Sequence, residues 1–149
     1  MAVSVLELHH HAMRIPPGQT AQVQDFYENV LGFEADPTRP SISTIPGAWM
    51  HVGRYGTSQV HLIGVGDGPS PIAQDRRRDP ARPHIALAVD DIEVARKELE
   101  RLEVPHWVFN DVPDMALVFL EDPAGNMIEL HQAGTCSCNR VATTPPDER

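Results

Sequence analysis

Two short stretches of alternating side chains, far apart in the chain, share one pattern. Residues 83–89 read PHIALAV and residues 9–15 read HHHAMRI. Successive side chains of a β-strand point to opposite faces, so His84 shares a face with two alanines while the other face is aliphatic. The first stretch matches in one register only, because a shift by one residue would move its large apolar side chains to the histidine face. We therefore predict one unit repeated twice, with His10 equivalent to His84.

The remaining pattern predicts the same order of elements, β-α-β-β-β, in both halves of the chain. In the first half we expect a strand at residues 9–15, a helix from Thr20 to Gly32, and strands at 33–35, 49–52 and 60–63, the last two joined across Gly53 and Gly56. In the second half we expect a strand at 83–89, a helix capped by Asp90, and strands at 107–109, 116–120 and 126–130.

Each predicted helix has apolar residues at the spacing of one buried face. These residues are Val23, Phe26, Tyr27 and Val30 in the first helix, and Ile92, Ala95, Leu99 and Leu102 in the second. The repeat predicts the α+β class and one domain over residues 1–132. Within it we expect module one at about residues 5–64, a Gly- and Pro-rich linker at 65–82 and module two at about 83–132, followed by a loosely held tail at 133–149.

Composition excludes several classes of partner. The formal net charge of −9 argues against nucleic acid and against an anionic membrane surface. The basic run from Arg76 to Arg78 lies in the linker, where we interpret it as a solvated loop, with an anion-binding patch as the alternative. No apolar run is long enough to span a bilayer and no secretory signal is visible, so the chain is predicted to be cytoplasmic. The two cysteines, Cys136 and Cys138, are predicted to be reduced thiols.

Four metal-competent residues occupy two pairs of equivalent positions. His61 lies in QVHLI and Glu129 in NMIEL, the strands that end the two repeats, and His10 and His84 lie in the strands that begin them. Imidazole nitrogens and a carboxylate suit a first-row divalent ion. We predict that the four bind one such ion (Ni, Co, Zn, Fe or Mn) per site. The alternative is that each histidine lies in a cleft or on the surface without a metal.

Three further residues are candidates for substrate binding. Arg14 shares the strand face of His10 and suits either an anionic substrate group or a salt bridge. Trp49 is a candidate for the pocket wall, although aromatic strand residues are more often core. His51 aligns with Phe119 when the final hairpins are matched at their ligands, and is interpreted either as a proton shuttle facing the cavity or as a partly exposed strand residue.

The other histidines are predicted to lie outside the metal site. In the register above, His9 and His11 lie on the strand face opposite that of His10 and so point away from the metal site. His106 begins a strand, and His131 is expected at a rim or on the surface because the last strand should end near it.

Three segments carry a resemblance to a known family. FYENVLGFE at residues 26–34, HIALAVDD at 84–91 and DPAGNMIEL at 122–130 resemble the vicinal oxygen chelate superfamily, which includes glyoxalase I, methylmalonyl-CoA epimerase, extradiol dioxygenases and drug-resistance proteins. The resemblance implies two βαβββ modules that form a curved half-barrel around a metal. It also implies a homodimer and a small substrate that chelates the metal through adjacent oxygens.

The resemblance leaves three functions open. In a glyoxalase- or epimerase-like lyase or isomerase, Glu129 moves a proton beside the metal-bound oxygen, with His61 in place of the usual Glu or Gln. In an Fe(II) extradiol dioxygenase, His10, His84 and Glu129 are the ligands and His61 is an extra ligand or an acid-base group. The third possibility is a drug- or metabolite-binding protein without metal chemistry.

The proposed register gives a first test. Replacing His84 or Glu129 with alanine is expected to abolish tight metal binding, because each removes a ligand, whereas His11→Ala and His9→Ala should leave it nearly intact. Metal content of the purified variants measures the effect. Loss of metal in His9→Ala as complete as in His10→Ala would contradict the register.

Overall fold

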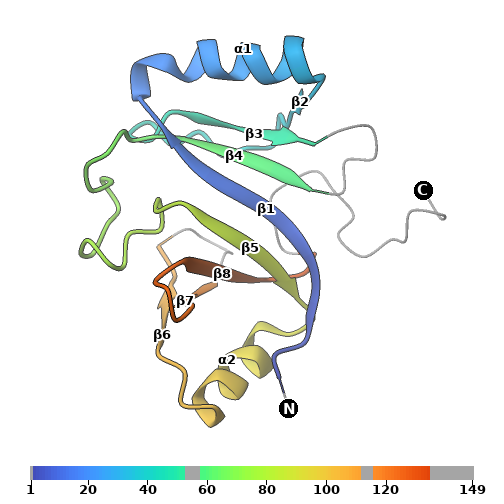
Figure 1. The fold of residues 1–149 in the computed structure, drawn as a ribbon, viewed down its shortest axis with the longest axis vertical. Helices are drawn as coiled ribbons and strands as arrows, with labels where there is room; N and C mark the ends of the chain where they lie inside the picture. The colour runs from blue at the N-terminus through green and yellow to red at the C-terminus, as the bar shows by residue number, and fades with distance from the viewer. Residues whose placement is uncertain (1, 53–57, 112–115, 135–149) are drawn as a thin grey trace, which may run out of the picture. The chain divides into compact units, whose positions relative to one another are not determined.

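The computed structural model describes residues 2–52, 58–111 and 116–134. Contacts divide this part of the chain into two compact units, a first unit of residues 10–83 and a second unit made of residues 2–9 and 84–134. Each unit contains strands of a β-sheet with one α-helix packed against them (Figure 1). The described chain therefore has mixed α and β structure in the order βαβββ repeated twice, as the sequence predicts.

The first unit holds four strands and two helical segments. Strand β1 (Val5–Ile15), of which residues from 10 onward belong to this unit, runs parallel to β4 (Gln59–Gly64). Strand β3 (Gly47–His51) pairs antiparallel with β4, and β2 (Glu34–Ala35) pairs antiparallel with β3. Between β1 and β2 lie the short 3-10 helix η1 (Pro17–Gln19) and helix α1 (Thr20–Leu31).

Helix α1 ends where the sequence predicts but packs less of its surface. Gly32 follows its last residue with φ of 70°, a left-handed conformation that glycine adopts without steric cost. Val23 and Tyr27 pack against the core of this unit, whereas Phe26 and Val30 are 52% and 63% exposed. The prediction that all four are buried is wrong for Phe26 and Val30, because only the 23/27 stripe faces β3 and β4.

The second unit repeats this plan. Strand β5 (His84–Val89) runs parallel to β8 (Met127–Gln132), β7 (Leu117–Glu121) pairs antiparallel with β8, and β6 (His106–Phe109) pairs antiparallel with β7. Helix α2 (Ile92–Arg101) packs against β7 and β8. The core that holds them together consists of Val89, Ile92, Ala95, Leu99, Val118 and Leu130.

Helix α2 begins one residue later than predicted. Asp91, rather than Asp90, is the N-cap, and its carboxylate accepts hydrogen bonds from the backbone N–H groups of Glu93 and Val94. Three of the four residues predicted to be buried are so, but Leu102 lies beyond the last helical residue and is 44% exposed.

Some predicted features lie outside the described residues. They include the glycines at 53 and 56 that were expected to join two strands, the two cysteines, and nearly all of the tail. Among the described residues, no helix is long and apolar enough to cross a membrane.

The position of the cap can be tested with two neighbouring substitutions. Asp91→Ala should lower the free energy of unfolding by about 1 kcal/mol, because it removes the acceptor for two N–H groups at the helix start. Asp90→Ala removes an exposed carboxylate that caps nothing, and should change stability by no more than about 0.5 kcal/mol. Urea unfolding of both variants measures the difference, and equal effects would contradict the assignment.

Candidate functional site

The parallel strand pairs of the two units have the same register. In the first unit His10 lies opposite Gln59, and the next residue on that face, Ala12, lies opposite His61. In the second unit His84 lies opposite Met127, and Ala86 lies opposite Glu129. Residues opposite one another in adjacent strands project to the same face of the sheet. Each unit therefore presents two metal-competent side chains on one face. A buried alanine, Ala12 or Ala86, lies directly opposite the second of them.

His84 and Glu129, the second half-site, are in direct contact. Nε2 of His84 lies 2.9 Å from Oε2 of Glu129, and both side chains are buried. The ring of Phe119 meets the His84 ring edge to face, at 5.9 Å between centroids.

This pair fits a first-row divalent ion. Two ligands at about 2.1 Å from a metal and at right angles to one another are about 3 Å apart, close to the separation of the two atoms in this pair. An ion could therefore bind both atoms with little movement of either side chain. One neutral imidazole and one carboxylate are also a donor set that such ions favour.

His10 and His61, the first half-site, are arranged differently. Their rings are stacked, with centroids 3.7 Å apart and planes 15° from parallel. On its other side His61 stacks against Trp49, at 4.6 Å and 10°. Trp49, which we predicted as a pocket residue, thus contacts a proposed ligand directly.

The stack limits how the first half-site can hold a metal. An imidazole binds a metal through the lone pair of a ring nitrogen, which lies in the ring plane. Stacked rings that are nearly parallel direct their in-plane lone pairs alongside one another rather than toward a common point. As they lie, the rings therefore offer one imidazole to an ion, and the second would have to turn. His61 remains a predicted ligand on that condition.

Sequence reasoning missed two polar residues next to this stack. Nε2 of His61 lies 2.9 Å from Oε1 of Gln59, and Nε2 of Gln59 donates to Oδ2 of Asp36 at 2.9 Å. Gln59 is 1% exposed and Asp36 is also buried. The available signal was that Gln59 precedes His61 by two residues and so shares its strand face.

The structure corrects the alignment predicted for His51. His51 lies opposite Gln59, and the residue opposite His61 is Trp49. The equivalent hairpin of the second unit places Phe119 opposite Glu129, so Phe119 matches Trp49 rather than His51. The cause is loop length, since seven residues separate β3 from β4 and five separate β7 from β8. Nδ1 of His51 lies 3.3 Å from Nε2 of Gln59.

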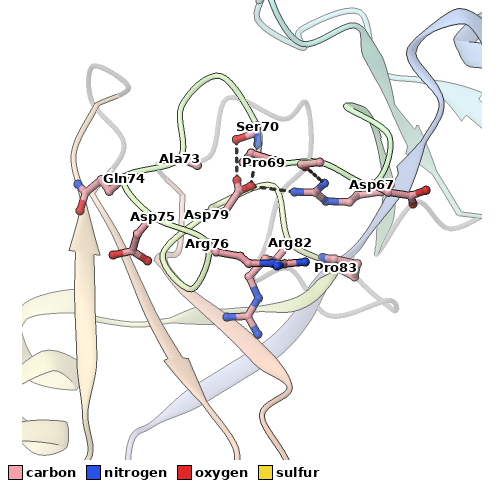
Figure 2. A pocket seen from close by; sticks show the side chains of 12 residues that line it. Asp67, Pro69, Ser70, Ala73, Gln74, Asp75, Arg76, Asp79, Arg82 and Pro83 are labelled. Carbon is pink, nitrogen blue, oxygen red and sulfur yellow. Dashed lines mark hydrogen bonds and ion pairs between the residues drawn. The ribbon is translucent and has the colours of Figure 1, made fainter.

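Arg14 anchors the linker of the first unit. Its guanidinium donates to the backbone oxygens of Ala81 and Gly66, each at 2.9 Å, and to that of Gly68, and forms an ion pair with Asp79 at 2.8 Å. Of the two roles predicted for Arg14, these contacts are those of the salt bridge. They also hold one side of a pocket of about 910 Å³ formed by linker residues of this unit (Figure 2).

Asp79 holds the linker together through several hydrogen bonds. Its carboxylate accepts hydrogen bonds from the backbone N–H and hydroxyl of Ser70 and from the N–H of Ala81, and Figure 2 shows it directed at Ser70. Burial on its own raises the pKa of Asp79. The hydrogen bonds from Ser70 and Ala81, together with the charge of Arg14, outweigh that effect and lower the pKa below its ordinary value.

The remaining histidines are placed as follows. His9 is fully buried and its ring meets that of His131 nearly at right angles, with centroids 4.4 Å apart. The prediction that His131 lies at a rim or on the surface is wrong, because β8 continues to Gln132 and buries it. His11 is exposed, which makes it a cleaner control for metal binding than His9. His106 is half-buried, with Nδ1 at 2.9 Å from the oxygen of Val104.

Comparison with known proteins identifies the family. Residues 8–130 match the model of the Glyoxalase/Bleomycin resistance protein/Dioxygenase superfamily, and the chain therefore belongs to that superfamily. The family and the α+β fold class predicted from the sequence are thus confirmed. No curated protein matches the chain.

Solved structures share the fold at low sequence identity. The methylmalonyl-CoA epimerase of Mycobacterium tuberculosis is 22% identical, with 89% of this chain and 91% of that chain covered, at a TM-score of 0.65. A variant of the Streptomyces coelicolor methylmalonyl-CoA epimerase, in complex with 2-nitronate-propionyl-CoA, is 15% identical (88% and 96% covered, TM-score 0.63). A catechol 2,3-dioxygenase is 17% identical, covering 97% of this chain and 43% of that chain, with a TM-score of 0.59.

The low pKa of Asp79 predicts a pH-dependent contribution to stability. A carboxyl whose pKa is lowered by folding stabilises the fold above its unfolded pKa, about 3.9, and this contribution is lost as the pH falls through the folded pKa. Asp79→Asn should therefore destabilise the protein at neutral pH by about 1–3 kcal/mol. The difference from the unmodified protein should shrink as the pH falls below about 4.

Urea unfolding at neutral and at acid pH measures this effect. Asp67→Asn is the matched control, because it removes the same charge from an exposed position in the same linker. A difference for Asp79→Asn that stays constant into acid would contradict a role for the ionised carboxylate.

Proposed function

We propose that this chain is a metal-dependent enzyme that moves a proton on a small substrate with two adjacent oxygens, as a glyoxalase- or epimerase-like lyase or isomerase. The observation that carries this proposal is the buried pair of His84 and Glu129, whose separation suits two ligands of one ion. We propose that His10 and, after a ring rotation, His61 complete the site. Such an ion would act as a Lewis acid that polarises a substrate carbonyl.

Two side chains are proposed to handle protons. Glu129 is the carboxylate among the four proposed ligands, so it is the proposed base or acid at the carbon next to the polarised oxygen. His61 is the second candidate, because an imidazole held by a hydrogen bond on one nitrogen can accept a proton on the other. A site with three imidazoles and one carboxylate suits proton transfer to and from carbon.

A second candidate function, Fe(II)-dependent ring-cleaving dioxygenase, is favoured by one specific observation. The hydrogen bond from His61 to Gln59, and the stacking of its ring, support a site with only three protein ligands, His10, His84 and Glu129. Two histidines and one carboxylate leave open positions for a catechol-like substrate and O2. A fourth protein ligand would have left fewer.

Metal analysis and isotope exchange separate these functions. Protein purified without added metal or chelator should carry about one divalent ion per chain, whichever of the two reactions it catalyses. A lyase or isomerase should exchange substrate C–H hydrogen for deuterium in D2O, tested with 2-oxoaldehyde–thiol adducts and acyl-CoA epimers. Iron, with O2 consumption on catechols, would favour the dioxygenase. Absence of metal, with ligand binding insensitive to a chelator, would favour a binding protein.

Glu129→Gln tests the proposed ligand and the proposed acid or base in one substitution. It keeps the shape of the side chain and removes the charge, so the bound metal should be lost or greatly reduced and turnover should fall by about 10²–10⁴-fold. Glu100→Gln removes one carboxylate from an exposed position of α2 and should change neither. Unchanged metal content in Glu129→Gln would contradict the ligand assignment. Size-exclusion chromatography of the same samples would test the proposed homodimer.

A further inference from the structure

A buried chain of hydrogen bonds leads from Asp36 to His61. Asp36 follows β2, and its backbone N–H donates to the oxygen of Trp49 in β3 at 2.8 Å. Its Oδ1 accepts from the backbone N–H and the hydroxyl of Thr38, at 2.9 and 2.6 Å. Its Oδ2 accepts from Nε2 of Gln59 at 2.9 Å. The carboxylate is therefore fixed on both oxygens and presents one of them to the glutamine.

These contacts determine which way the glutamine amide points. Since a carboxylate only accepts, the NH2 group of Gln59 must face Asp36, and its oxygen must then face His61. The second N–H of the same NH2 group points to Nδ1 of His51 at 3.3 Å. In that arrangement Nε2 of His51 carries its proton and lies 3.7 Å from Oδ2 of Asp36. The hydrogen bonds of Gln59 to Asp36 and His61 therefore require its amide to point with the NH2 group toward Asp36 and the oxygen toward His61.

The arrangement fixes the tautomer of His61. The amide oxygen of Gln59 accepts from Nε2 of His61 at 2.9 Å, so Nε2 carries the proton and Nδ1 holds the lone pair. We infer that Gln59, held by Asp36, is a positioning residue that keeps His61 in the Nε2–H tautomer and leaves Nδ1 as the nitrogen that accepts a proton or a metal. The role of that nitrogen in turnover rests on the proposed function, whereas the tautomer itself does not.

The described residues of the second unit have a different side chain at the position equivalent to Gln59. The residue equivalent to Gln59 in the shared register is Met127, which lies opposite His84 and whose side chain has no N–H or carbonyl oxygen. A carboxylate such as Glu129 accepts through either oxygen and needs no selection of a tautomer. A neutral imidazole has two tautomers of different chemistry, so the histidine at the equivalent position requires a partner that selects one.

Nitrogen NMR of metal-free protein labelled with 15N-histidine tests the inference. Spectra are recorded at mildly alkaline pH, where imidazoles are neutral, and His61 is assigned from the spectrum of His61→Gln. In the unmodified protein Nε2 of His61 should give a protonated-type signal and Nδ1 an unprotonated-type signal. Gln59→Met keeps the volume but removes the acceptor, and should move both signals toward a mixture of tautomers.

His106 is the internal control. Its Nδ1 faces the backbone oxygen of Val104, so it should show the opposite tautomer, with the proton on Nδ1, in every variant. The paired exchange Asp36→Asn with Gln59→Glu reverses the donor and acceptor between the two side chains. It leaves an acceptor for His61, and should restore the Nε2–H signals that Gln59→Met disturbs.

The outcomes separate this inference from the proposed function. A proton on Nδ1 of His61 in the unmodified protein, or unchanged signals in Gln59→Met, would overturn the inference whether or not the protein is an enzyme. If turnover is found, Gln59→Met should lower kcat by about 10- to 100-fold with little change in KM, and the paired exchange should recover part of the loss. If no turnover or metal is found, the tautomer can still be read from the same spectra.

Discussion

The candidate site depends on the register of two parallel strand pairs. In β1 with β4, and in β5 with β8, the histidine of the first strand and the metal-competent residue of the second are offset by the same two positions. Because side chains alternate between faces, a slip of one residue in either pair would turn one member of the half-site to the opposite face. Small alanines at 12 and 86 lie between the larger side chains and leave room for them.

The two units use the same frame for different chemistry. In the second unit this register brings an imidazole nitrogen and a carboxylate oxygen to 2.9 Å from one another. This pair of donor atoms suits a divalent metal ion. In the first unit the same register brings two imidazoles together, and their rings stack on one another. The histidine in place of a carboxylate therefore changes the geometry of the half-site as well as its charge, and this difference is what keeps both proton transfer and oxygen chemistry open.

Buried carboxylates organise the irregular parts of the first unit. Asp36 joins the segment after β2 to β3 and β4 through Thr38, Trp49 and Gln59. Asp79 joins Arg14 of β1 to the linker through Ser70 and Ala81. Burying a charge is costly unless hydrogen bonds and an opposite charge compensate for it, so each carboxylate constrains every group that contacts it. Loops that carry few apolar residues are thereby held in one conformation.

The sequence by itself determined the repeat, the order of the elements and the equivalence of His61 with Glu129, because these follow from the two-residue period of strands and from local signals such as Gly32 after a helix. The family followed from the resemblance of three segments, at residues 26–34, 84–91 and 122–130. Only the tertiary structure decided that Asp36 meets Gln59, that Trp49 rather than His51 lies opposite His61, and that Arg14 binds Asp79. These contacts join distant parts of the chain, and they depend on loop lengths and on strand ends that periodicity does not measure. The stacking of His10 on His61 is likewise a matter of ring rotation, which no one-dimensional pattern records.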